Sequence, residues 1–391
     1  MARTRGERAR RLRALGDRSR GVPELLRAHT GQAYRQVLAY AEKRLLGKLE
    51  GPRTTVWYDP REVGPEDREW VLTRCESAYR KICARLDLSS ESSVSVFLYP
   101  KRMEPLLWNA LPLLGRLRPD EVHVYFDSPS DHGPILHEMT HVLTRSLATF
   151  GGNGPPPALL VEGLAEYVVG APWGIDVDVW SRGVDLLGRR VAVTTLADSQ
   201  AFRRANPVVA YELAGSFVRF LIERFGLEAF KRLYSHPDFL EVYGQQLAVL
   251  EGRWLERLRG IEPAEREMGW IRYRTLLADA WDARRGPEEF AWLGVDVAED
   301  SLKGVRVVRV WPESPAMREG LRAGDRILEV DGMAVPKGGS WVLATALLAK
   351  TPGDQIALVL DRGTAKVHMT VRTDSEMARG GRMAKRAHND H

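Results

Sequence analysis

The chain has 391 residues, of which 44% are hydrophobic and 28% are charged, and its formal net charge is +5. It is too long for one ordinary domain and suits two, each large enough to bury a core. No apolar run approaches the ~18 residues that a membrane-spanning helix needs. Cys75 and Cys83 lie in a segment predicted as helix, about 12 Å apart along its axis. We therefore expect two free thiols and no disulfide framework.

Positive charge is concentrated at the N-terminus. Residues 1–20 contain eight arginines against Glu7 and Asp17, so this segment carries +6 and the remainder −1. We expect a solvated, disordered arm without specific nucleic-acid binding. No apolar stretch typical of a signal peptide follows it, and the sequence therefore predicts a cytoplasmic protein by default, with export as the alternative if the start site is mis-assigned.

The first part of the chain predicts helices followed by strands. The spacing of leucine and valine predicts one helix over 21–50, and a second helix is expected over 65–86. Ser92–Tyr99 alternates in the manner of a strand and is followed by Pro100. Glu121–Asp127 is predicted as another strand.

A metal-binding pattern follows this last strand. Apolar residues between 135 and 147 recur at helical spacing, and the same helix carries His137, Glu138 and His141 in the order His-Glu-Met-Thr-His. Residues i and i+4 share one face of a helix, so both imidazoles can reach one ion. Glu138 lies beside them and suits a general base. This is the HExxH arrangement of zinc peptidases.

A helix predicted over Ala158–Val169 supplies further carboxylates in the stretch LVEGLAEY. Together the two stretches resemble the gluzincins, zinc peptidases whose third ligand is a glutamate on a following helix. The resemblance implies that Glu162 is the third zinc ligand. It also implies that Glu166, one turn further, orients a ligand histidine. The implied fold is α+β, a mostly helical, zincin-like domain with a small sheet and one zinc ion per chain.

The resemblance further implies peptide hydrolysis, with Glu138 taking a proton from the attacking water. We consider Tyr211, near the start of a helix predicted over Val208–Arg224, as the residue that stabilises the oxyanion. His236 is the weaker alternative, and a packing role for Tyr211 stays open. His123 is expected to be structural or substrate-facing, and its strand is a candidate edge for pairing with the substrate backbone.

One departure from the larger relatives concerns specificity. The chain lacks the G-x-M-E-N stretch by which the large aminopeptidases of this clan recognise a free amino terminus. Aminopeptidase specificity is therefore not supported, and the choice between endo- and exopeptidase action stays open.

Helices are expected to continue to about residue 284, and short strands separated by turns follow. They are predicted over Leu293–Val297, Val305–Val310, Arg326–Val330, Gln355–Leu360 and Lys366–Val371, with one helix near Ser340–Lys350. The stretches WLGV, SPA, GDRI, VDG and PGD, in this order, resemble a bacterial PDZ domain of the kind attached to HtrA-like and site-2-type proteases. The resemblance implies peptide binding by strand addition, with a C-terminal carboxylate held at Leu293, Gly294 and Val295.

These predictions combine into one domain plan and one function. The plan is a basic tail (1–20), a zincin-like peptidase domain (21–260), a connecting helix or linker (261–287), a PDZ domain (288–373) and a disordered tail (374–391). We predict a zinc metallopeptidase whose PDZ domain recruits peptide or protein substrates. One alternative is a zinc-containing PDZ scaffold with weak or no peptidase activity, against which the intact Glu138 argues. Another is a metal-dependent hydrolase of other substrates, against which the PDZ domain argues.

Overall fold

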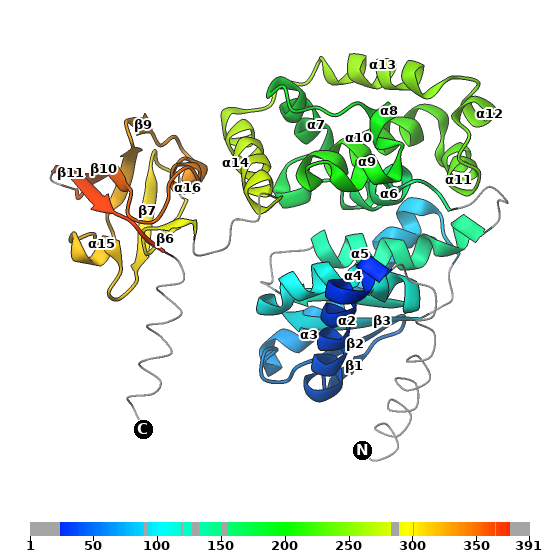
Figure 1. The fold of residues 1–391 in the computed structure, drawn as a ribbon, viewed down its shortest axis with the longest axis horizontal. Coiled ribbons are helices and arrows are strands. Elements are labelled where there is room, and N and C mark those ends of the chain that lie inside the picture. The colour runs from blue at the N-terminus through cyan, green and yellow to red at the C-terminus, as the bar shows by residue number, and fades with distance from the viewer. Residues whose placement is uncertain are drawn as a thin grey trace. The chain divides into compact units, whose positions relative to one another are not determined.

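The computed structural model divides by its internal contacts into two compact units. The first comprises Met1–Gly174 and Ala214–Gln246, and the second comprises Ile175–Leu213 and Leu247–His391. Figure 1 traces the chain through both. The structure describes residues 24–89, 93–118, 120–126, 133–149, 155–282, 289–299, 301–363 and 365–375. The predicted tail 1–20 and most of the tail 374–391 lie outside these residues, and the predicted domain boundaries stay predictions.

A four-stranded sheet in the order β1-β2-β3-β4 forms the centre of the first unit. β1 runs antiparallel to β2, whereas β2, β3 and β4 are mutually parallel, and their register aligns Trp57 with Phe97 and Phe97 with His123. Among the described strands β4 therefore lies at an edge, and the helix that carries the HExxH pattern is the next described element along the chain. The strands are β1 (Gly47–Glu50), β2 (Thr54–Tyr58), β3 (Val94–Pro100) and β4 (Glu121–Phe126).

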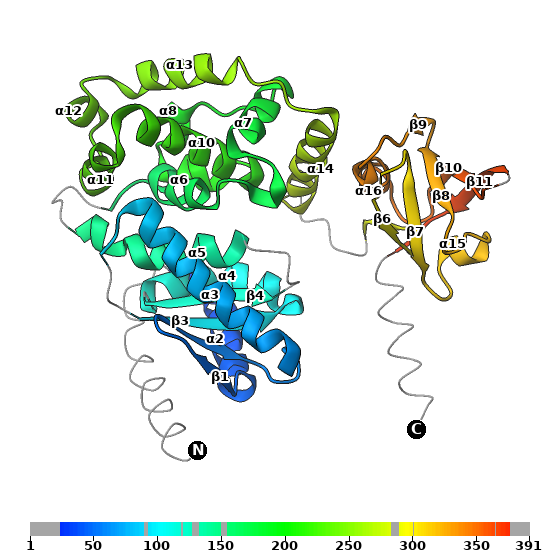
Figure 2. The same ribbon diagram turned by 180° about the vertical axis from the view of Figure 1, so that it is seen from behind.

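Helices cover both faces of this sheet. Phe97 and Tyr99 of β3 pack against α2 and α4 in one apolar cluster, and α3 and α5 lie on the other side, as the two opposite views show (Figure 1, Figure 2). Alternate residues of a strand point to opposite faces, so a sheet covered on both sides needs the apolar run found in β3. The helices are α2 (Glu24–Arg44), α3 (Pro65–Leu86), α4 (Glu104–Leu117), α5 (Gly133–Thr144), α6 (Ala158–Val169), α11 (Leu227–Ser235) and α12 (Phe239–Tyr243), with the second part of α10 (Pro207–Phe225).

The prediction of one helix over 21–50 is wrong at its C-terminal end. α2 ends at Arg44, and Gly47 begins β1, where it lies opposite Tyr58 of β2. A Cβ atom on Gly47 would lie 2.4 Å from the Tyr58 ring, so the glycine is required by the tight packing of this strand pair. The same glycine is a poor helix former. The strands β1 and β2 and the helix α4 were not predicted.

The prediction for the second helix and its cysteines is confirmed. α3 spans Pro65–Leu86, and both Cys75 and Cys83 lie in it as free thiols. Burial raises the pKa of Cys75 to about 12, so this thiol stays protonated and packs as an apolar side chain.

The second unit begins as a layer of helices. Its core includes Trp180 of α7 and Trp254 of α13, whose side chains are fully buried. Glu251 accepts hydrogen bonds from the backbone N–H groups of Val193 and Thr194, and so satisfies donors at the start of α8. The helices are α7 (Val177–Leu186), α8 (Val193–Leu196), α9 (Ser199–Arg204), the first part of α10, α13 (Leu247–Leu258) and α14 (Glu265–Asp282).

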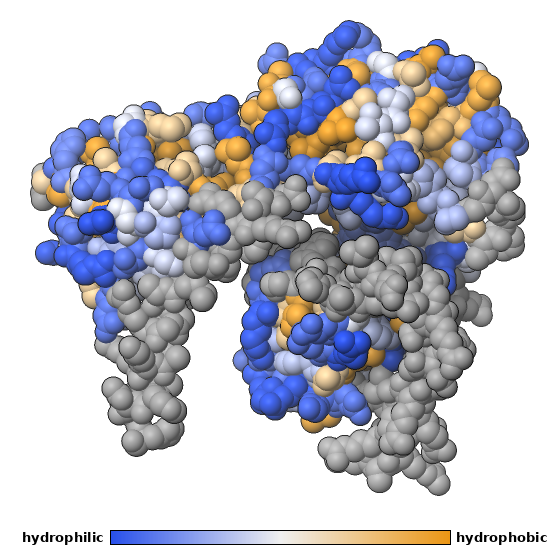
Figure 3. Space-filling view, in the orientation of Figure 1, coloured by the Kyte–Doolittle hydropathy of each residue, from blue (hydrophilic) through white to orange (hydrophobic). Residues whose placement is uncertain are grey.

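A C-terminal β domain (residues 289–375) completes this unit and confirms the strands predicted there. Its main sheet has the order β11-β10-β8-β7-β6, so β6 and β11 are the edge strands. Gly294, at φ +86°, interrupts the predicted strand Leu293–Val297. In the space-filling view hydrophilic residues cover most of the visible surface of this domain (Figure 3). Its elements are β5 (Ala291–Trp292), β6 (Val295–Ala298), β7 (Val305–Val310), α15 (Pro315–Arg318), β8 (Arg326–Val330), β9 (Met333–Ala334), α16 (Ser340–Leu348), β10 (Gln355–Asp361), β11 (Lys366–Arg372) and β12 (Asp374–Ser375), which pairs with β5.

Candidate metal centre

Helix α5 presents two histidines on the side opposite its buried face. Leu136, Met139 and Leu143 recur at helical spacing and are buried, which fixes the rotation of the helix. His137 and His141 then share the other face and remain partly accessible, with 14% and 25% of their side chains exposed. The helix therefore offers both imidazoles to one point outside its packed surface.

Helix α6 brings the carboxylates to the same point and is fixed by a close helix crossing. Glu162 and Glu166 lie one turn apart in α6. Between them, Gly163 faces α10, where a Cβ atom would lie 2.7 Å from the backbone oxygen of Ala214 and 2.7 Å from Cγ2 of Val218. Only glycine permits so close an approach. The sequence prediction missed this role, although a glycine inside a predicted helix was its signal.

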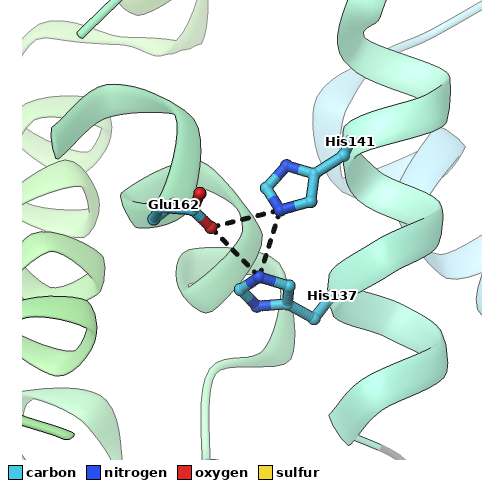
Figure 4. Close-up of side chains that lie close together, drawn as sticks. All are labelled: His137, His141 and Glu162. Atoms are coloured by element: carbon cyan, nitrogen blue, oxygen red, sulfur yellow. Dashed lines mark hydrogen bonds and ion pairs between the residues drawn. The ribbon is translucent and has the colours of Figure 1, made fainter. Parts of the chain in front are cut away.

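Three ligand atoms converge between the two helices (Figure 4). Nε2 of His137 lies 3.1 Å from Nε2 of His141, and Oε2 of Glu162 lies 3.2 Å from each of them. Two ligands in a tetrahedral zinc site, each about 2.0–2.1 Å from the ion, are about 3.3 Å apart. The donor set of two imidazoles and one carboxylate, and the size of this triangle, therefore fit zinc. Among the described residues, this is the cluster of histidine and carboxylate side chains that could hold a metal ion.

Glu166 fixes the orientation of the first histidine. Its Oε1 lies 2.8 Å from Nδ1 of His137. A carboxylate accepts hydrogen bonds, so the proton of the neutral imidazole sits on Nδ1 and the lone pair of Nε2 points at the triangle. The structure thus brings together four of the predicted site residues, His137, His141, Glu162 and Glu166.

The electrostatics of the cluster favour a positive charge at its centre. Burial lowers the pKa of His137, but hydrogen bonds to Glu162 and Glu166 outweigh burial and hold this pKa well above its usual value. Burial raises the pKa of Glu162, but the charge of His141 and the bonds from both histidines bring it below its usual value. Protons on the imidazoles, or a metal cation in their place, supply this charge. Burial also raises the pKa of Glu138.

Tyr211 and His236 were the two candidates for oxyanion stabilisation. Tyr211 belongs to the second unit, where its ring packs 5.4 Å from that of Phe202, and its predicted role stays a prediction. His236 follows α11, and its Nε2 lies 3.0 Å from Oε2 of Glu241 near the surface.

His123 is a buried structural residue. Its side chain is 2% exposed, Tyr99 Oη lies 3.0 Å from Nδ1, and Glu121 Oε2 lies 3.2 Å from Nε2. Glu121 in turn accepts from the Arg118 guanidinium, and the imidazole stacks on Phe97 with the ring centres 4.8 Å apart. Of the two roles predicted for His123, these contacts support the structural one. Burial lowers its pKa, and the Arg118 charge acts in the same direction.

This buried imidazole predicts a pH-dependent stability. Because the pKa of His123 is below 6.5 in the folded chain, the unfolded chain binds more protons just below that pH, and the stabilisation by His123 is lost as the pH falls. We expect the stability difference between the natural chain and His123→Gln to shrink by up to about 1.4 kcal/mol per pH unit as the pH falls below about 6.5. Urea unfolding at several pH values measures it, with His236→Gln as the surface control. A difference that stays constant over this range contradicts the prediction.

The C-terminal β domain forms the loop predicted to hold a carboxylate. The backbone oxygen of Leu293 accepts from the N–H of Ala316, and that of Gly294 accepts from the N–H of Trp311. A Cβ atom on Gly294 would lie 2.1 Å from Cβ of Ser314, so the WLGV and SPA stretches pack directly on each other. Val295 begins the edge strand β6.

Comparison with known proteins identifies this domain. Residues 291–373 match the family model of the PDZ domain. The chain is also similar to the regulator of sigma-E protease RseP of Escherichia coli (strain K12), with 35% identity over 71 residues. This match spans 18% of the chain and 15% of the relative. It agrees with the predicted resemblance to a metallopeptidase that carries a PDZ domain, over a short local stretch.

Two solved structures are also similar to a part of the chain. The HtrA3 PDZ domain bound to a phage-derived ligand is 22% identical, and the match covers 22% of this chain and 85% of that one with a TM-score of 0.19. The HtrA-type protease AlgW with a decapeptide is 24% identical, with 26% and 34% covered and a TM-score of 0.23.

The prediction of a cytoplasmic protein is corrected by the match to RseP, because that relative is a membrane protease. Among the described residues, no helix combines the length and the apolar character needed to cross a membrane.

Proposed function

We propose that the chain is a zinc-dependent metallopeptidase of the gluzincin type that uses its PDZ domain to recruit peptide or protein substrates. One observation carries the proposal. Two imidazole nitrogens and one carboxylate oxygen, from an HExxH helix and the helix that follows it, converge within 3.2 Å of one another. Three protein ligands with a fourth position left for water or substrate are typical of catalytic zinc.

The surroundings of the triangle support a zincin-like fold. A small sheet precedes α5, and its edge strand β4 is the last described element before that helix. Among the described strands β4 pairs only with β3. An extended substrate could add to such an edge through backbone hydrogen bonds. We assign β4 as the substrate-binding edge.

Glu138 is the proposed general base. A bound zinc ion would polarise the scissile carbonyl and lower the pKa of water. Glu138 lies next to His137 in α5, and burial raises its pKa, so its carboxylate binds a proton more readily than an exposed one. It takes the proton of the attacking water and delivers it to the leaving amine. Glu166 holds His137 in place through Nδ1 throughout.

The PDZ domain is the proposed recruiting module. Among the described strands β6 lies at an edge of its sheet, and the backbone at Leu293 and Gly294 precedes this strand. PDZ domains bind extended peptides by adding a strand to such an edge. We propose that a C-terminal peptide binds here, with its carboxylate at Leu293, Gly294 and Val295.

Metal removal and restoration tests the function. The full chain is incubated with a diverse peptide mixture, and the products are read by mass spectrometry. We expect cuts with the zinc-loaded protein, none after chelation, and the same cuts when zinc is restored. The positions of the cuts would distinguish endo- from exopeptidase action. A protein with zinc bound that cuts nothing in the mixture contradicts the proposal and favours a zinc-containing scaffold.

A further inference from the structure

The helix α14, which precedes the PDZ domain, is firmly attached to the helices of its own unit. Nδ2 of Asn206 donates to the backbone oxygen of Thr275 at 3.0 Å and to Asp279 at 2.6 Å. Ile271 is fully buried and fills the space beside Gly183 of α7, where a Cβ atom would lie 2.4 Å from its Cδ1. One side of α14 is therefore packed and hydrogen-bonded within the helical layer of this unit.

Another side of α14 carries a glycine that local structure does not require. Gly269 lies inside the helix, where glycine costs about 1 kcal/mol relative to alanine. A Cβ atom on Gly269 would lie 2.1 Å from Cε2 of Trp341, the second residue of α16 in the PDZ domain. The indole thus rests directly on the helix backbone. Trp341 also packs against the apolar core of the PDZ domain, so this contact joins two packed bodies.

A polar contact flanks this packing. Nη2 of Arg266, one turn before Gly269, donates to Oε2 of Glu299 at 3.3 Å. Oε1 of the same carboxylate accepts from the backbone N–H of Ser340 at 3.1 Å and from the Ser340 hydroxyl. Glu299 follows the edge strand β6, and Ser340 begins α16. This carboxylate therefore links α14, the end of β6 and the start of α16.

We infer that α14 is an interaction surface for the chain's own PDZ domain, with Gly269 as the socket for Trp341. This surface contacts α16. Glu299, which follows the proposed peptide-binding edge β6, accepts hydrogen bonds from Ser340 at the start of α16. The PDZ domain therefore packs on α14 through α16, the helix linked by Glu299 to the end of β6. The inference does not depend on peptidase activity, and it gives the connecting helix or linker predicted over residues 261–287 a docking role in its described part.

A double-mutant cycle in the full chain tests the socket, with hydrogen–deuterium exchange in α14 and α16 as the readout. We expect Gly269→Ala to raise exchange in the middle of α14 and at the start of α16 about tenfold, because the added methyl overlaps the indole. Trp341→Ala should raise it similarly. In the Trp341→Ala background, Gly269→Ala should cause no further increase, because the clash is gone.

Two further variants keep the test decisive. Gly252→Ala, in α13 with no atom within 4 Å of the new Cβ, should leave exchange in α14 and α16 unchanged. Trp341→Phe should preserve protection, because Nε1 of Trp341 has no hydrogen-bond partner among the described residues and the ring itself makes the contact. Exchange in α8 and β10, elsewhere in the same unit, reports whether each variant folds. Equal behaviour of Gly269→Ala and Gly252→Ala, or fully additive effects in the cycle, would overturn the inference.

Discussion

A Glu138→Gln variant is expected to bind zinc as the natural chain does and to lose peptide hydrolysis by about 10²- to 10⁴-fold in kcat/KM, the usual contribution of a general base. Glutamine keeps the shape of the side chain but cannot accept the proton of the attacking water. The ligand triangle of His137, His141 and Glu162 does not include this side chain, so zinc affinity should change little. Steady-state kinetics on a peptide found in the cleavage screen, with zinc content measured in parallel, gives both quantities.

A matched control separates the role of the base from general loss of carboxylates. Glu228→Gln in α11 changes an exposed glutamate of the same unit and should leave the rate unchanged. If Glu138→Gln retained zinc and more than half of the activity, Glu138 would not be the base.

A Gly163→Ala variant is expected to destabilise the first unit by about 2–3 kcal/mol and to weaken zinc binding, although alanine is the better helix former. The added methyl would lie 2.7 Å from the backbone oxygen of Ala214, and a backbone group cannot rotate away. α6 must therefore move from α10, and Glu162, the neighbouring residue, moves with it. Zinc titration against a competing chelator and urea unfolding measure the two effects.

The control is another helical glycine in the same unit. Gly115 in α4 has no atom within 4 Å of an added Cβ, so Gly115→Ala should keep or slightly raise stability and leave zinc affinity unchanged. Similar results for both variants would show that the crossing of α6 and α10 is not what holds Glu162.

The metal centre could be predicted because its geometry is mostly local. The spacing of His137 and His141 is enough to place both on one helix face, and the stretch around Glu162 and Glu166 fixes the second helix in the same way. The position of the second helix is not set locally. α6 packs against α10 through Gly163 and Ala214, a contact between segments far apart in the sequence, and no periodicity in either segment reveals it.

The parts of the fold that were missed have comparable causes. β1 is four residues long, and Gly47 is explained only by the Tyr58 ring opposite it. α4 contains Pro112, which reads as a helix breaker, yet the packing of α4 on α2 and β4 maintains the helix. In the PDZ domain the longer strands alternate regularly and are separated by glycines, so β7, β8, β10 and β11 were predicted to within one residue, whereas the two-residue strands β5, β9 and β12 were not predicted.

The first unit is assembled from two separated stretches of chain, and this affects the order in which it can form during synthesis. Gly163 packs against Ala214 and Val218 of α10. The ribosome synthesises these two residues only after the whole stretch Ile175–Leu213 of the other unit. At about 5–20 residues per second, the 55 residues from Gly163 to Val218 take about 3–11 s to translate. Throughout that time a nascent chain holds the three proposed metal ligands but lacks the helix that packs against Gly163 of α6. The ligand triangle therefore reaches its final form only after α10 has left the ribosome, and nascent chains that stop short of α10 expose the apolar face of α6 to chaperones and proteases.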